Sequence, residues 1–426
     1  MKKTFLFLAL LIPVMSWGQT KENKENKETK PKVSIHGFIR TDLIGDSRQN
    51  VYALEGMYAA FPKKPELDAN GEDINDQGAL RELSLFSRLS FKVIGPDIFN
   101  AKTSGLIEFD AMGGVGKGGA TNELRFRHAF VKLDWTKSSL VVGRTWHPFF
   151  VTSTFPIVLN LNTGIPYQPF SRSPQISFTK SLNEKVKAQI SAIYQSQYAN
   201  VGPDGKSPDY QRNAVVPNLN FLLKRETKDF KAGISYDLLV IQPDLYTVGI
   251  NNKKYKSTKL LYSNRFMAYA DAILGKLEVK AKTTYGQNMS DLLLGGGYAI
   301  SDIKESTGEV TYTQNYNSAT FVELLYKCDE QLTLALFGGY MTNKQYQDEL
   351  YTGKGKAAVY AKYADVDYSY RISPAVYYKV KNMKLGAEYE YNVAAYGDFD
   401  FNNKGEIDNS EEVSNHRLTL SLCYFF

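Results

Sequence analysis

Arginines gather around one apolar segment of this chain. Arg125 and Arg127 are two residues apart, so on an extended strand both guanidinium groups project from the same face. Arg144 falls on the next predicted strand, and Arg172 is the only charged residue in the segment 147–174. Guanidinium groups that line a narrow passage attract anions. These residue types and spacings therefore indicate interaction with negatively charged solutes.

The segment 147–174 is unusual for a connection between strands. It reads HPFFVTSTFPIVLNLNTGIPYQPFSRSP and is rich in proline and aromatic residues. A segment this apolar needs a surface to pack against. We predict that it folds into the interior as a constriction loop, with Arg40 and Arg88 facing inward from other strands. The alternative is a loop that lies on the surface or contacts another subunit.

Motifs for catalysis are absent from the sequence. The four histidines are scattered singly, and the chain contains no HExxH, CxxC or GxSxG motif. Two cysteines in an exported chain do not suggest a disulfide framework, and we expect Cys328 and Cys423 to be free thiols. The sequence therefore predicts no enzyme activity, no cofactor and no metal.

The elements that must position these arginines are β-strands of roughly 9–13 residues, the length of tilted membrane strands. No segment after the N-terminal one has about 18 consecutive apolar residues, so no transmembrane helix is expected. We predict an all-β fold, a transmembrane antiparallel β-barrel of about sixteen strands. The predicted strands are 33–43, 82–93, 101–111, 123–135, 139–146, 175–181, 185–197, 215–225, 229–239, 258–271, 276–288, 315–327, 331–342, 366–380, 383–395 and 412–426.

Short and long connections alternate along the chain, which is typical of barrels with short periplasmic turns and long extracellular loops. An even strand number closes the sheet and leaves no unpaired edge in hydrocarbon. Strand 123–135 has two hydrophobic phases, and a bulge near His128 would reconcile them. A soluble propeller or double sandwich is the alternative, but neither requires alternating connection lengths.

The last strand carries the clearest alternation. Leu418, Leu420 and Leu422 fall on one face, while Arg417 and Thr419 fall on the other. Apolar and polar residues that alternate in this way predict a lipid-facing side and a lumen side. The abundance of tyrosine, with 29 residues, suits the interfacial girdles of a membrane barrel.

The N-terminal region has two parts. Residues 1–18 have a basic start, a short apolar stretch and small residues at the cleavage positions, as in a secretory signal peptide. A membrane anchor is the alternative, but the apolar stretch is too short to span a bilayer of about 30 Å. Residues 19–32 consist of charged and polar residues, predicting a flexible periplasmic tail. Residues 33–426 would form the barrel. A formal charge of +6 gives no indication of nucleic-acid binding.

Three stretches are similar to a known family. RFRHAFVKLDW, LVVGRTWHPFF and PYQPFSRSPQISF resemble the trimeric DcaP-like and Bacteroidota porins of Gram-negative outer membranes. The resemblance implies a homotrimer surrounded by outer-membrane lipid that passes small, often anionic solutes, with Arg125, Arg127 and Arg144 lining the pore. The C-terminal strand resembles the signature whose terminal aromatic residue, here Phe426, is read by the barrel-insertion machinery. The charged tail departs from relatives that carry a periplasmic coiled coil, because it lacks apolar heptad positions.

Two functions are compatible with these features. The first is a passive diffusion channel in the outer membrane with a weak anion preference. Its candidate pore-lining residues are Arg125, Arg127, Arg144, Arg172, Arg40 and Arg88. The second is a barrel that serves as a structural or accessory subunit of an envelope complex, in which the tail and the long loops would bind partners.

Overall fold

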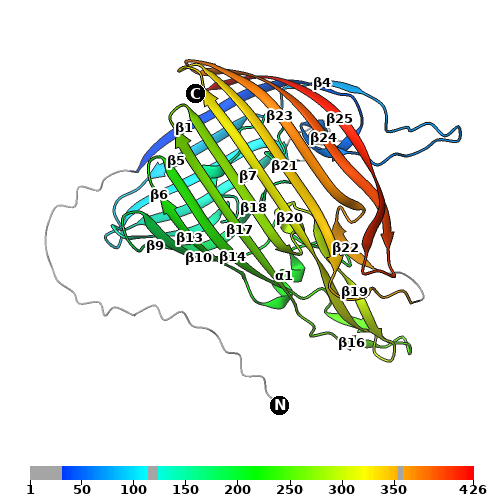
Figure 1. Cartoon of the computed structure of the whole chain (residues 1–426). Helices are drawn as coiled ribbons and strands as arrows, with labels where there is room; N and C mark the ends of the chain where they lie inside the picture. The colour runs from blue at the N-terminus through cyan, green and yellow to red at the C-terminus, as the bar shows by residue number, and fades with distance from the viewer. Residues whose placement is uncertain (1–30, 114–122, 354–357) are drawn as a thin grey trace, which may run out of the picture.

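The chain folds into a closed antiparallel β-barrel (Figure 1), described here by a computed structural model over residues 31–113, 123–353 and 358–426. The predicted signal peptide and nearly all of the predicted tail lie outside the described residues. Strand β1 pairs with β25 on one side and with β5 on the other, which closes the sheet. The predicted fold class and strand number are therefore confirmed.

Sixteen strands form the wall. They are β1 (Lys32–Asp46), β5 (Arg88–Ile94), β6 (Lys102–Gly113), β7 (Glu123–Asp134), β8 (Ser138–Trp146), β9 (Arg172–Ser181), β10 (Val186–Ile193), β13 (Asn218–Glu226), β14 (Phe230–Ile241), β17 (Leu261–Leu274), β18 (Leu277–Gln287), β20 (Glu309–Lys327), β21 (Leu332–Tyr346), β23 (Val366–Val380), β24 (Met383–Asp400) and β25 (Glu406–Phe425).

Shorter elements lie in or beside the long connections. They are β2 (Asn50–Ala53), η1 (Leu54–Gly56), β3 (Tyr58–Pro62), β4 (Ala79–Leu83), η2 (Thr152–Thr154), β11 (Val201–Gly202), β12 (Gly205–Lys206), α1 (Asp209–Ala214), β15 (Tyr246–Val248), β16 (Lys254–Lys256), η3 (Ser290–Leu292), β19 (Gly296–Lys304) and β22 (Val359–Lys362). Within the described residues, no helix is long and apolar enough to cross a membrane.

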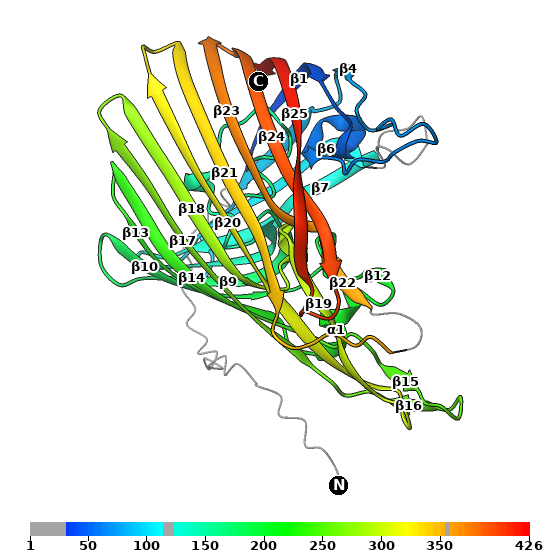
Figure 2. The same cartoon turned by 45° about the vertical axis from the view of Figure 1, so that its right-hand side comes forward.

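Alternation along β25 follows the sequence prediction. Leu418, Leu420 and Leu422 are exposed on the outer face, whereas Arg417 and Thr419 are buried. The short connections gather at one end of the barrel, where the backbone N–H of Phe426 donates to the carbonyl of Gly37 at 3.1 Å. The β15–β16 hairpin and the β19–β20 turn project beyond the opposite end (Figure 2). We call these the short-turn end and the long-loop end.

The predicted strand 82–93 is interrupted, which corrects the sequence prediction. Leu83 of β4 pairs with Asp42, and Arg88 of β5 pairs with Phe38, so four residues, 84–87, lie opposite three. Such an extra residue bends a strand locally. Here the bend buries Phe86, whose ring lies 5.5 Å from the guanidinium carbon of Arg40.

The predicted bulge in strand 123–135 is present at Arg127. Glu108 of β6 pairs with His128, and Phe109 pairs with Phe126, so Arg127 has no partner of its own. As a result Arg127 and His128 are both buried, at 5% exposure each, while Phe126 stays on the outer face. The bulge therefore changes the phase of the strand without placing an arginine on the outer surface.

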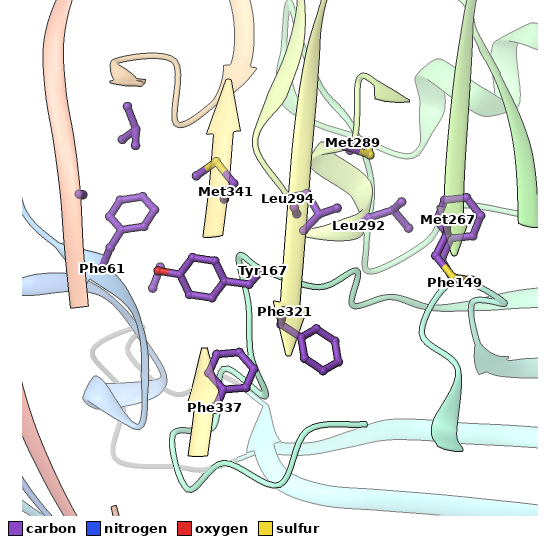
Figure 3. Close-up of a cluster of buried hydrophobic side chains, with 14 of the residues drawn as sticks. Phe61, Phe149, Tyr167, Met267, Met289, Leu292, Leu294, Phe321, Phe337 and Met341 are labelled. Atoms are coloured by element: carbon purple, nitrogen blue, oxygen red, sulfur yellow. The ribbon is translucent and has the colours of Figure 1, made fainter. Parts of the chain in front are cut away.

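Part of the lumen is apolar, which the alternation of polar and apolar residues did not predict. Phe321, Phe337 and Met341 project inward from β20 and β21 and pack against Phe149 and Tyr167 of the segment 147–171. Figure 3 shows these side chains gathered within one cluster. Burial of one such side chain stabilises a fold by roughly 1.5–3 kcal/mol. The apolar wall therefore matches the apolar segment that covers it.

Candidate functional site: the channel cavity

The segment between β8 and β9, residues 147–171, lies against the inner wall. Its backbone N–H groups at Ile157 and Leu159 donate to the carboxylates of Glu323 and Glu388, at 2.6 Å and 2.7 Å. The hydroxyl of Tyr167 donates to Asn392 at 3.0 Å. These acceptors belong to β20 and β24, which are far from β8 and β9 in the order of strands around the barrel. The segment therefore crosses the interior.

Basic groups of the wall hold the same segment. Arg371 of β23 donates to Asn162 at 3.1 Å and forms an ion pair of 2.7 Å with Glu388. Lys282 of β18 donates to the carbonyl of Phe150 and to Gln168. Arg371, Lys282 and Glu388 are each at most 2% exposed. Their charges are therefore paired or hydrogen-bonded beneath the segment and do not face the open part of the lumen.

A second connection also enters the barrel. The hairpin of β2 and β3, residues 50–62, was predicted as part of a long external loop. Instead, Arg417 donates to the carbonyl of Gly56 at 2.5 Å, and Asn392 donates to that of Ala60 at 2.8 Å. The sequence signal that could have indicated this is the apolar run YAAFP, because Ala60 and Phe61 are almost fully buried against the wall.

A cavity of about 680 Å³ remains between these two inward segments and the wall. At the short-turn end it is lined by Phe38, Lys384 and Phe425, and near the long-loop end by Lys206 and Lys362. The cavity therefore extends along the barrel from one end toward the other. This is the geometry of a passage, whereas a closed binding pocket would have walls on all sides.

The charge on the cavity wall has one sign. Eight basic residues line it, and no aspartate or glutamate of the described ranges does. The basic residues are Arg40, Arg88, Arg125, Arg127, Arg172, Lys206, Lys362 and Lys384. Five of the six arginines singled out from the sequence are brought together here. Among the inward-facing acids, Glu108 and Asp110 pair with lining arginines, and Glu323 and Glu388 bind the segment 147–171.

Arg125 and Arg127 are positioned by β6. Arg125 makes a bidentate pair with Asp110, with N–O distances of 2.9 Å and 2.8 Å. Arg127 donates to Glu108 at 2.7 Å and to Asp110 at 3.1 Å. Bidentate pairs fix a guanidinium in a defined orientation. The acids thus hold the two arginines in place, and the Arg125 side chain keeps 17% exposure toward the cavity.

Arg40 and Arg88 lie nearer to the short-turn end. Arg40 donates to Asp42 at 2.8 Å and to the carbonyl of Leu159 at 2.5 Å, which links the wall to the inward segment. Arg88 lies 5.0 Å from the ring of Phe38 and 5.3 Å from that of Phe86. Aromatic faces attract cations, so these rings orient the guanidinium without removing its charge.

Arg172 and Arg144 differ in placement. Arg172 is fully buried, donates to the hydroxyl of Tyr198 at 2.9 Å and lies 4.9 Å from the ring of Trp146. No ion pair joins the Arg172 guanidinium to a carboxylate within the described ranges. Its contacts are therefore aromatic side chains. Arg144 is half-exposed, contacts the carbonyl of Phe126 at 3.4 Å and does not line the cavity.

Two lining lysines were not identified from the sequence. Lys206 and Lys362 lie in connections at the long-loop end, where no strand alternation indicates which side chains face the lumen. Both cysteines are free, as predicted, and Cys423 lines the cavity. Over residues 31–113, 123–353 and 358–426, no group of three or more His, Cys, Asp or Glu side chains is placed to hold a metal ion.

Comparison with known proteins relates this architecture to channels. The outer membrane channel DcaP of Acinetobacter baumannii aligns with a TM-score of 0.69 at 17% identity, over 93% of this chain and 97% of that one. An anion-selective porin from Comamonas acidovorans aligns with a TM-score of 0.53 at 10% identity, over 93% and 100%. OmpF of Salmonella typhi aligns with a TM-score of 0.51 at 14% identity, over 92% and 97%.

No protein-family model matches the sequence, and no curated protein matches it either. The likeness is therefore one of structure at low sequence identity. The structural neighbours are porins, which are channels and not enzymes. This chain has the fold of the outer-membrane porins.

Proposed function

We propose that the protein is an outer-membrane porin, a passive diffusion channel for small hydrophilic solutes with a weak preference for anions. The preference is set by the arginines and lysines of the cavity, and the inward segment 147–171 narrows the passage. In this proposal residues 1–18 direct export and residues 19–32 form a periplasmic tail. The barrel-insertion machinery recognises Phe426. The protein assembles into a homotrimer of the kind found in the Bacteroidota porin group.

One observation carries the proposal. Eight basic residues, of which Arg172 is fully buried, and no carboxylate of the described residues line the cavity wall. Fixed charges of one sign on a low-dielectric wall raise the local concentration of counter-ions. Rings of arginine and lysine select anions in this way. The pairs with Asp110 and Glu108 reduce the net charge, so the preference is weak.

Ion substitution in planar bilayers tests the proposal. Replacing chloride by the bulky anion gluconate should lower the single-channel conductance more than replacing potassium by the bulky cation N-methylglucamine. Changing Arg125 and Arg127 to Ala together should reduce this difference, because Asp110 then loses both of its arginine partners and Glu108 keeps only Arg88. A folded barrel that gives no stepwise conductance contradicts the channel. An unchanged difference in the double variant contradicts the role of these arginines.

Two further variants separate the charge effect from damage to the fold. Arg144→Ala removes one arginine of the same region that does not line the cavity, so selectivity should stay as in the wild type. Adding Asp110→Asn to the double variant removes the carboxylate that has lost its partners. This triple variant should shift selectivity back toward anions relative to the double variant.

A further inference from the structure

Lys206 and Lys362 come together from two separate connections at the long-loop end. Lys206 ends the small hairpin of β11 and β12, and Lys362 ends β22, and β11 packs against β22. Both side chains line the channel cavity. The packing of β11 against β22 brings the two lysines to the same part of the cavity wall. Two like charges are thus held near one another at the mouth of the passage.

Neither lysine has an acidic partner among the described residues, whereas Arg125 has one and Arg127 has two. Their neighbours are aromatic. The ammonium nitrogen of Lys362 lies 4.8 Å from the centre of the Tyr363 ring, and that of Lys206 lies 5.9 Å from the centre of the Tyr198 ring. Rings hold a cation in place but leave its donors free for an anion.

Like charges in a partly buried position destabilise each other. Burial and the charge of Lys206 together lower the pKa of Lys362 to about 8. An oxyanion placed between the two ammonium groups would accept hydrogen bonds from both and remove the repulsion. Such charge-assisted hydrogen bonds are stronger than neutral ones. A bound anion would therefore stabilise the two lysines at the end of the barrel where a solute would enter.

We propose that Lys206 and Lys362 form an entry site that binds small multivalent oxyanions, carboxylates or phosphates, before they reach the arginines of the narrower region. This inference rests on the proposed function and deepens it. The site would hold an anion transiently from the long-loop end. The tyrosine rings beside it would supply apolar contact but no competing charge.

The test is block of chloride current by citrate and by inorganic phosphate, each added to one side of a bilayer at a time. In the wild type, block should occur at a lower anion concentration when the anion is added on the side that the long-loop end faces. In Lys206→Met with Lys362→Met, the half-blocking concentration from that side should rise about tenfold, because charge-assisted contacts are lost. Comparing citrate with phosphate identifies which oxyanion the site prefers.

Matched variants keep the test decisive. Lys344→Met removes an exposed lysine of the long-loop end that does not line this cavity, so block should stay as in the wild type. Lys206→Arg with Lys362→Arg keeps both charges and should restore most of the block. Equal block of the wild type and the double methionine variant overturns the entry site. A wild type without anion preference overturns the proposed function instead, so the two failures are distinguishable.

Discussion

The inner wall of the barrel has two regions that share the same strand alternation but differ in what they face. The covered half consists of β18, β20, β21 and β23 with the adjoining part of β24, and it lies beneath the segment 147–171. The open half consists of β1, β5, β7, β8, β9 and β25 with Lys384 of β24, and it lines the cavity; the remaining strands belong to neither region. Arg371 in the covered half is 0% exposed, whereas the Arg88 side chain in the open half is 23% exposed.

Charge that faces inward and charge that a solute meets in the pore are therefore different quantities. The covered half contains Glu323, Glu388 and Glu390, which bind backbone and side-chain donors of the inward segment. These acids hold the segment in place but contact no solute path. Removing them from the lumen leaves the basic groups of the open half in excess. Selectivity therefore depends on where the inward segment lies as well as on composition.

The largest effect should come from breaking the covered half. Glu388→Ala removes the ion pair with Arg371 and the acceptor for the N–H of Leu159. Arg371 keeps its second ion pair, with Glu390 at 3.0 Å. Because buried donors of Arg371 and Leu159 lose their acceptor, we expect a loss of about 1–3 kcal/mol in the free energy of unfolding. Urea unfolding of the detergent-solubilised protein measures this loss. Glu411→Ala changes an exposed acid of β25 and should leave stability unchanged within error.

The open half should distinguish reagents by charge. Cys423 lies between its cross-strand partners Arg40 and Lys384 and lines the cavity. In a Cys328→Ser background, an anionic thiosulfonate reagent should modify it roughly three to ten times faster than a cationic reagent of similar size. In the Cys423→Ser variant the same two reagents modify Cys328 in the short turn. There the ratio of the anionic to the cationic modification rate should be smaller. Equal rates at Cys423 contradict a basic cavity.

Alkaline pH should weaken anion preference by a modest amount. The pKa of Lys362 is lowered to about 8, so its charge is present below that pH and is lost as pH rises through it. Arginine side chains stay protonated throughout, so most of the cavity charge is unchanged. The anion selectivity of the wild type should therefore be slightly lower at about pH 9 than at about pH 7. The fall should be smaller in Lys362→Met and not absent, because burial also lowers the pKa of Lys206.

The smallest effect should come from Arg144→Ala. Arg144 is half-exposed, makes one hydrogen bond of 3.4 Å and lies outside the cavity lining. We expect a change in the free energy of unfolding within about 0.5 kcal/mol and no change in selectivity. A loss of selectivity as large as that of the Arg125 and Arg127 double variant would show that the passage extends past Arg144.

Sequence patterns predicted the wall well because strand alternation is a local property. The period of two residues placed Leu418 outside and Arg417 inside, and the two hydrophobic phases of strand 123–135 indicated the bulge found at Arg127. The break at 84–87 was missed because Leu83, Leu85 and Leu89 keep an unbroken alternation in the sequence. In the structure the phase reverses across the break, so Leu83 lies inward beside Asp42, whereas the inward residue of β5 is Arg88. The apolar composition of 147–174 indicated a segment that needs an apolar surface.

The site was only partly predictable, because loops bring together residues that no local pattern relates. Alternation gave the inward direction of Arg40 and Arg88, but it could not show that Arg371 is covered and Arg88 is not. The entry of residues 50–62 depends on contacts with β24 and β25, which are more than 300 residues away along the chain. Lys206 and Lys362 lie in connections, where side-chain direction has no period.

The zero-current potential of the wild-type channel in a potassium chloride gradient tests the account most directly, because it measures the sign of the charge that a permeating ion meets. A basic open half predicts a potential displaced toward the chloride equilibrium value. A potential displaced toward the potassium value would mean that acids line the path, and it would contradict the assignment of the two halves.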